Sequence, residues 1–269
     1  MSQTIIKFLF PLSIALVVGF SLLWFYLRNK NKYEMVDAFW AWSLALAAIT
    51  IAVFSEGTEE RRWLMASLTS IWAIRLGGFL FWGRIKKGLS DGRYENWIKE
   101  MGDKVNFKMF LFFQVQALSV IFLSVTFIAV CSAQHTIVVY DFLAIALFLI
   151  AILGEWHSDR TLNQFRLNPA NKGKVCNIGL WQYSRHPNYF FEWMHWLCYP
   201  LFCIGSSTEF LMSLIGPLSL LVLILKVSGI PLTEAQAIRS RGQAYKDYQM
   251  TTPSFFPNIF RKKKNDFTR

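Results

Sequence analysis

Ionisable side chains gather at the end of an apolar run near residue 155. Glu155 and Asp159 are four residues apart, so a helix that continues through them places both carboxylates on one face. Arg166 follows two turns after Asp159. Charged groups beside such a run are costly unless they pair or bind a ligand. The segment therefore predicts either a polar site or a capped, solvated helix end with its own ion pairs.

A second polar stretch, from Gly179 to Glu192, opens the next apolar segment. Pro187 favours the first turn of a helix. A helix that begins there directs backbone N–H groups towards the preceding loop, which suits a phosphate or carboxylate ligand. Asn188 and Glu192 are spaced i and i+4, so the two side chains share one face of that helix. The two stretches together predict a polar site at residues 155–192.

These polar residues are embedded in a chain with the composition of a membrane protein. Of its 269 residues, 54% are hydrophobic and 17% are charged, which is too apolar for a soluble domain of this length. A spanning helix needs about 20 apolar residues. Seven windows approach that length, so we expect an all-α, polytopic bundle of about seven spans, in which the sixth window is short and polar enough to be a partial span. The windows run from Ile5 to Leu27, Val36 to Ser55, Trp63 to Trp82, Met109 to Cys131, Tyr140 to Trp156, Tyr189 to Ile204 and Phe210 to Ile230.

The distribution of positive charge predicts the orientation of these spans. Most of the 28 lysine and arginine residues fall in alternate loops and in the C-terminal tail, with its basic run at Arg261–Lys264. Cytoplasmic loops carry such an excess. Seven spans with the N-terminus outside and the C-terminus in the cytoplasm satisfy every loop, and we expect a multi-pass protein of a bacterial inner membrane.

The net charge of +11 has the same explanation, because positive loops also contact anionic lipid head groups. We therefore expect membrane lipids as partners and no nucleic acid. The four cysteines show no metal-ligand spacing, so no metal site is expected. No linker or internal repeat divides the chain, which favours one membrane domain over residues 1–269.

The polar segments resemble a known family. Its C-terminal motif is matched by Glu155 to Asp159, Arg166, Lys174, Gly179 to Tyr183, Asn188 and Glu192. The chain resembles the C-terminal domain of the steroid 5-alpha-reductase family, and most closely its bacterial, DUF1295-like branch of unknown function, in which the run from Ser184 to Tyr189 is characteristic. The likeness covers roughly residues 35–257.

The resemblance implies a seven-helix reductase that binds NADPH on the cytoplasmic side and reduces a carbon–carbon double bond conjugated to a ketone in a lipophilic substrate. It implies a cofactor-binding region at residues 154–257. Asn188 and Glu192 follow Pro187 into an apolar segment, so we expect them at the nicotinamide end, and Arg166 and Lys174 at the phosphates. The cofactor contacts expected in this way are Asp159, Arg166, Lys174, Tyr183, Arg185, His186, Asn188, Glu192 and Tyr248.

One part of the family pattern is missing. The tyrosine in the third span and the glutamine–glutamate pair in the second, which hold the ketone in steroid-reducing members, have no match here. Asp37 and Tyr94 are the remaining candidates for substrate contact, each with a structural role as its alternative. The resemblance therefore supports cofactor binding better than steroid reduction.

Two other readings stay open. The run from Arg185 to Tyr189, with Glu234, Gly242, Tyr245 and Tyr248, also resembles S-adenosylmethionine-dependent methyltransferases of the isoprenylcysteine and phospholipid type. The missing substrate tyrosine also allows a membrane protein without catalytic activity. Asn188, Glu192 and the segment His157 to Asp159 favour the reductase.

Overall fold

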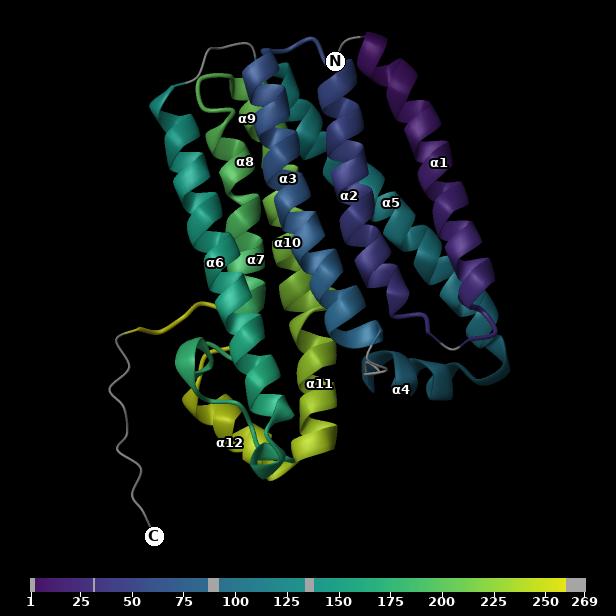
Figure 1. Cartoon of the computed structure of the whole chain (residues 1–269), viewed down its shortest axis with the longest axis vertical. Coiled ribbons are helices and arrows are strands. Elements are labelled where there is room, and N and C mark those ends of the chain that lie inside the picture. Colours follow the sequence, from purple (N-terminus) through teal and green to yellow (C-terminus); the bar gives the residue numbers. More distant parts are fainter. Residues whose placement is uncertain (1–2, 31, 87–91, 134–137, 260–269) are drawn as a thin grey trace. The chain divides into compact units, whose positions relative to one another are not determined.

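The computed structural model of the chain describes residues 3–30, 32–86, 92–133 and 138–259, and the regular structure in these residues is helical (Figure 1). The basic run at Arg261–Lys264 lies outside them. The long helices are α1 (Gln3–Leu27), α2 (Met35–Phe54), α3 (Glu59–Leu80), α5 (Val105–Ser132) and α6 (Val139–Leu167). The shorter ones are α4 (Gly92–Met101), α7 (Pro187–Trp196), α8 (Cys198–Leu201), α9 (Ser207–Ser213), α10 (Ile215–Val222), α11 (Ile230–Arg241) and α12 (Gln243–Thr251).

Six helical segments of the described residues are long and apolar enough to cross a membrane. They confirm the all-helical fold and the membrane prediction, because a backbone in lipid must satisfy its own hydrogen bonds. The last of them runs from Ser207 to Arg241 and includes a π-helical stretch at Leu223–Val227. The sixth predicted window, Tyr189 to Ile204, is instead broken at Leu197 into α7 and α8. The count of seven spans is therefore not confirmed.

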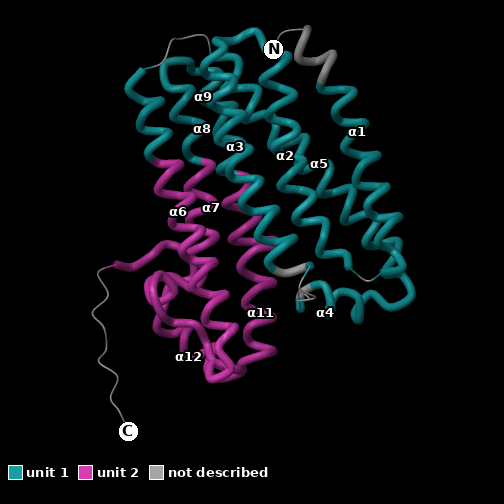
Figure 2. Tube along the Cα trace, in the orientation of Figure 1, with its two compact units in different colours: residues 1–146, 197–218 teal, residues 147–196, 219–269 magenta. Residues whose placement is uncertain are grey.

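The chain forms two compact units (Figure 2). Unit 1 contains residues 1–146 and 197–218, and unit 2 contains residues 147–196 and 219–269. The predicted cofactor-binding region, residues 154–257, lies in unit 2 except for residues 197–218, which belong to unit 1. Its binding role and the single-domain assignment stay predictions.

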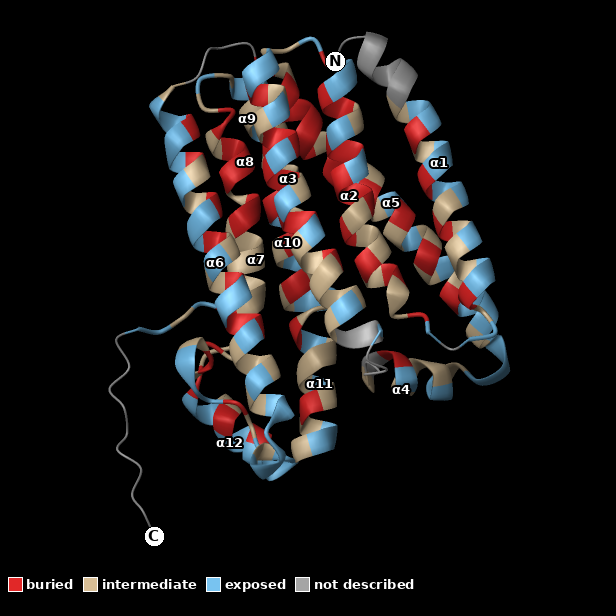
Figure 3. Cartoon of the chain, viewed as in Figure 1, coloured by how far each residue is buried: buried red, intermediate tan, exposed pale blue. Residues whose placement is uncertain are grey.

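In unit 1, α2 packs along α3 and α5, and α1 packs along α5. Small residues on α2 make this close approach possible, since Ala41, Ala45, Ala48 and Ala52 recur at helical spacing and are buried. Figure 3 shows buried positions concentrated on α2, α3 and α5, whereas α1 is mostly exposed. The exposed side of α1 is apolar, as expected for a surface in contact with lipid.

A buried ion pair joins the first turns of α3 and α6 in unit 1. Arg61 Nη2 lies 2.9 Å from Asp141 Oδ2, and each side chain is only 1% exposed. Asp141 also accepts from the backbone N–H of Val138 at 2.7 Å. Arg61, which lies between the second and third predicted windows, is therefore a packed structural residue. A charge at this depth is tolerated because its partner is equally buried.

In unit 2, α6 continues without interruption through Glu155, Asp159 and Arg166, as the spacing predicts. It packs against α7 at a glycine: a Cβ placed on Gly154 would lie 2.5 Å from the ring of Phe191. Only glycine permits this approach. The contact brings the polar end of α6 beside the start of α7, which begins at Pro187 as predicted.

Candidate functional site

The first element of the site is a polar contact between α6 and α7 in unit 2. Asn188 Nδ2 donates to Asp159 Oδ1 at 3.3 Å, and Asp159 is 7% exposed. The other amide atom, Asn188 Oδ1, is buried and has no hydrogen-bond partner among the described residues. Glu192 is half-buried one turn further along α7. The structure thus brings together Asp159 and Asn188, with Glu192 on the same helix face as Asn188.

The second element is a small basic pocket of about 120 Å³, also within unit 2. Its cations come from three segments: Arg166 near the end of α6, Lys172 and Lys174 in the following turn, and Arg241 at the end of α11. None of the residues that line it is acidic. The other lining residues are Leu162, Phe165, Asn171, Gly173 and Cys176.

Hydrogen bonds from side chains to backbone carbonyls, and one glycine turn, fix the shape of this pocket. Asn171 Nδ2 donates to the carbonyl of Phe165 at 3.0 Å, and Gly173 takes a left-handed φ of 79° that favours glycine. Arg241 Nε donates to the carbonyl of Lys174 at 3.0 Å, which ties α11 to the turn. Four cations without an acidic neighbour in the lining form a site for an anion, and for a phosphate in particular.

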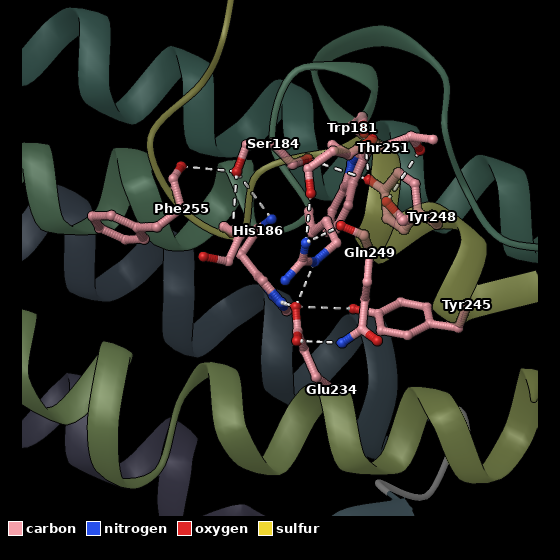
Figure 4. Close-up of polar contacts among 12 residues, drawn as sticks. Trp181, Ser184, His186, Glu234, Tyr245, Tyr248, Gln249, Thr251 and Phe255 are labelled. Carbon is pink, nitrogen blue, oxygen red and sulfur yellow. Dashed lines mark hydrogen bonds and ion pairs between the residues drawn. The ribbon is translucent and has the colours of Figure 1, made fainter.

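The third element is a hydrogen-bonded cluster around Glu234 of α11 (Figure 4). Glu234 Oε1 accepts from Arg185 Nε at 2.6 Å and lies 3.1 Å from His186 Nε2. Glu234 Oε2 accepts from Gln249 Nε2 at 2.7 Å. Arg185 and Glu234 are 11% and 13% exposed, so the pair is largely desolvated. This cluster joins the start of α7 to α11 and α12.

The same loop holds the segment that follows α12. Arg185 donates through its backbone N–H to the carbonyl of Pro253 at 2.9 Å and through Nη1 to the carbonyls of Gln249 and Thr252. Ser184 Oγ donates to the carbonyl of Phe255 at 2.8 Å, and Tyr248 donates to the carbonyl of Trp181. Arg185 and Tyr248 therefore hold this loop and the end of α12 together, and their contacts with a cofactor stay a prediction.

Burial controls the protonation of two members of the Glu234 cluster. It lowers the pKa of His186 below its usual 6.5, although the hydrogen bond to Glu234 opposes the shift. Burial, and then the nearby Glu234 carboxylate, raise the pKa of Tyr245. His186 also stacks on Tyr189 with ring centroids 5.3 Å apart. Both groups are therefore neutral at pH 7, and His186 is a packing residue in this cluster.

The low pKa of His186 predicts a pH dependence of stability. The unfolded chain takes up a proton on this histidine near pH 6.5, whereas the folded chain resists it. This contribution to stability is full above about pH 6.5 and falls as the pH drops towards the folded-state pKa. We expect His186→Gln to flatten this part of the melting-temperature profile, measured between about pH 5 and 8. His157→Gln, at an exposed position on α6, should leave it unchanged.

The two candidates for substrate contact lie in unit 1 and bind each other. Tyr94 of α4 donates to Asp37 Oδ1 of α2 at 2.8 Å. Tyr94 is 3% exposed and packs against Trp97 and Phe112. The bond holds α4 against α2 within unit 1. This is the structural alternative expected for both residues, and their contact with a substrate stays a prediction.

The structure therefore places the predicted site residues in separate groups. Asp159 and Asn188 meet, Arg166 and Lys174 share the basic pocket, and Arg185 and His186 belong to the Glu234 cluster. Tyr183 follows the short 3-10 helix at Gly179–Gln182, and its carbonyl accepts from the backbone N–H of Asn258. Sequence reasoning missed Lys172 and Arg241 as pocket residues, and Gln249 as a partner of Glu234. It named Glu234 only through the methyltransferase resemblance.

Comparison with known proteins places the chain in a family. The family described as "Protein of unknown function (DUF1295)" matches residues 23–252. An uncharacterized protein of Schizosaccharomyces pombe, C594.04c, is 24% identical over 279 residues, which cover 93% of this chain and 80% of the relative. No solved structure matches. The family match extends from α1 into the residues that follow α12 and includes every element of the site, and the chain belongs to the DUF1295 family.

Proposed function

We propose that this protein is a membrane-embedded, NADPH-dependent reductase of a carbon–carbon double bond conjugated to a ketone, related in function to the steroid 5-alpha-reductases. The observation that carries the proposal is the basic pocket, which lies along the same helix as the contact between Asp159 and Asn188. A phosphorylated dinucleotide has both an anionic end and a ring that carries an amide. The basic pocket matches the anionic end, and the contact between Asp159 and Asn188 matches the amide.

The spacing along α6 supports this assignment. Asp159 and Arg166 are seven residues apart in one helix, which places them on one side and about 10 Å apart along its axis. A cofactor extended along this side places its phosphates near Arg166 and Lys174 and its nicotinamide near Asn188. This order follows the depth expected from the sequence, in which Asn188 begins an apolar segment and the cations precede it.

The residues near Asn188 fit a carboxamide. Asn188 Oδ1 is a buried acceptor, and its amide nitrogen is already held by Asp159. A nicotinamide N–H has the chemistry to satisfy this oxygen, because a buried polar atom without a partner is costly. Glu192 on the same face offers a second acceptor. Fixing the carboxamide at two points orients the ring.

When bound, NADPH supplies the hydride that adds to the far carbon of the enone, and a proton then completes the saturated ketone. The chain's contribution is to hold the anionic end with cations at the surface and to keep the reacting end away from water. A lipophilic substrate reaches such a site from the membrane.

The polar contacts favour this reaction over methyl transfer. S-adenosylmethionine carries one carboxylate and no phosphate, so it matches a pocket lined by four cations less well than NADPH does. Glu234 is the glutamate of the methyltransferase-like motif. Both of its carboxylate oxygens form hydrogen bonds, with Arg185, His186 and Gln249. It acts as a scaffold residue in this chain.

We also propose the orientation expected from the basic loops in a bacterial inner membrane, with residues 189–204 as the sixth of seven crossings. Reporter fusions after residues 95, 170 and 265 are then expected to report cytoplasm, and fusions after residues 60 and 135 the outside. Cytoplasmic signals at both 60 and 135 would show the orientation to be wrong.

Isotope transfer tests the reaction without a known substrate. Protein in lipid nanodiscs is incubated with a membrane lipid extract and NADPH deuterated at the transferable C4 position, and lipids are examined by mass spectrometry. The proposal predicts a saturated lipid carrying one deuterium, and much less of it with Asn188→Leu. A parallel reaction uses S-adenosylmethionine with a deuterated methyl group. Transfer of a labelled methyl group to lipid, without transfer of deuterium from NADPH, would show that the protein is a methyltransferase and not a reductase.

A further inference from the structure

We infer that the basic pocket binds a terminal phosphate monoester, namely the 2′-phosphate that distinguishes NADPH from NADH, and that Lys172 and Arg241 set this preference. The inference rests on the proposed function. It deepens that function by naming which phosphate enters the pocket and which residues recognise it.

The size of the pocket supports one phosphate group. The pocket has a volume of about 120 Å³, whereas sites that enclose a whole ligand measure about 300–1,000 Å³. Only one end of a dinucleotide fits. The pyrophosphate links the two nucleosides of the cofactor, so it has no free end that could enter a small pocket. The 2′-phosphate is a terminal group.

The positive charge of the pocket also favours the 2′-phosphate over the pyrophosphate. A phosphate monoester carries about 1.5 to 2 negative charges at pH 7 and three acceptor oxygens, whereas each phosphate of a pyrophosphate diester carries one charge. The pocket meets this group with Arg166, Lys172, Lys174 and Arg241 and with no acidic lining residue. Lys172 and Lys174 flank Gly173, where the chain turns with φ of 79°. The turn therefore contributes two lysines to one pocket.

Two residues of the pocket are expected to contact the 2′-phosphate without contacting the rest of the cofactor. Arg166 lies on α6 with Asp159, so it also stands near the path proposed for the pyrophosphate. Lys172 lies in the turn and Arg241 at the end of α11, away from that helix. Loss of either residue should therefore affect NADPH more than NADH.

Competition binding with nucleotide fragments tests the inference on purified full-length protein. The probes are NADPH, NADH, 2′,5′-ADP, 5′-AMP and inorganic phosphate, with affinities from calorimetry. We expect the wild-type protein to prefer NADPH to NADH by about 10- to 100-fold, and 2′,5′-ADP but not 5′-AMP to compete with NADPH. Lys172→Gln and Arg241→Gln should each reduce the NADPH preference by about tenfold and leave the NADH affinity unchanged.

The controls distinguish the possible failures. Arg241 also holds the turn, so exposed Lys172 gives the cleaner variant, and Lys246→Gln, at an exposed position outside the pocket, should change nothing. Equal losses for NADPH and NADH would overturn the inference but leave the proposed function intact. Binding of inorganic phosphate without competition by 2′,5′-ADP would assign the pocket to another phosphate, such as a lipid head group. If neither dinucleotide binds the wild-type protein, the proposed function and the inference fail together.

Discussion

Arg185→Leu is expected to lower the stability of the protein by about 3–5 kcal/mol, because it leaves the Glu234 carboxylate without its cation in a largely desolvated cluster. It also removes the donors that Arg185 gives to the carbonyls of Gln249 and Thr252. The segment that follows α12 then loses part of its attachment to the start of α7. Thermal unfolding of the purified protein in detergent measures the effect.

Two further variants identify the cause. Arg185→Lys keeps the charge but cannot reproduce the several donors of a guanidinium, so its stability should lie between those of Arg185→Leu and the wild type. Lys246→Gln removes an exposed cation of the same unit and should be neutral. A wild-type melting temperature in Arg185→Leu, combined with weakened NADPH binding, would show that Arg185 contacts the cofactor and is not a scaffold residue.

The second large effect is expected on binding. Charge-assisted hydrogen bonds contribute about 1.5–3 kcal/mol each, so Arg166→Gln and Lys174→Gln together should weaken NADPH binding by roughly 100- to 10,000-fold. Both side chains are exposed at the pocket, so the melting temperature without ligand should change little. Calorimetric titration with NADPH gives the affinity of each variant.

The matched control is Lys99→Gln with Lys246→Gln, which removes two exposed cations outside the pocket and keeps the same net charge as the first pair of changes. Equal weakening by both pairs would mean that general positive charge attracts the nucleotide and that the pocket has no specific role.

The long helices were predictable from sequence because hydropathy and length are local properties. The windows at Val36–Ser55 and Met109–Cys131 match α2 and α5 within a few residues. The break at Leu197 was not predictable in the same way. A window averages over its residues, whereas the break between α7 and α8 depends on packing at single positions.

The site was predictable only in part, because its elements join residues that are far apart in the chain. Asp159, Arg166 and Asn188 lie in one polar region whose spacing indicates function. Arg241 lies 67 positions from Lys174, whose carbonyl it binds, and nothing in the intervening sequence marks the contact. Arg185 illustrates the same limit: the motif predicts a cofactor contact, which stays a prediction, but it does not indicate that the donors of Arg185 hold Glu234 and the end of α12.

The most direct test of the account is thermal unfolding of the purified wild-type protein with NADPH and, separately, with S-adenosylmethionine. A ligand that binds only the folded state stabilises it by about 2.7 kcal/mol at 100 times its dissociation constant, which raises the melting temperature. We expect a rise that grows with NADPH concentration and is absent in the Arg166→Gln, Lys174→Gln double variant. A rise with S-adenosylmethionine and none with NADPH would contradict it.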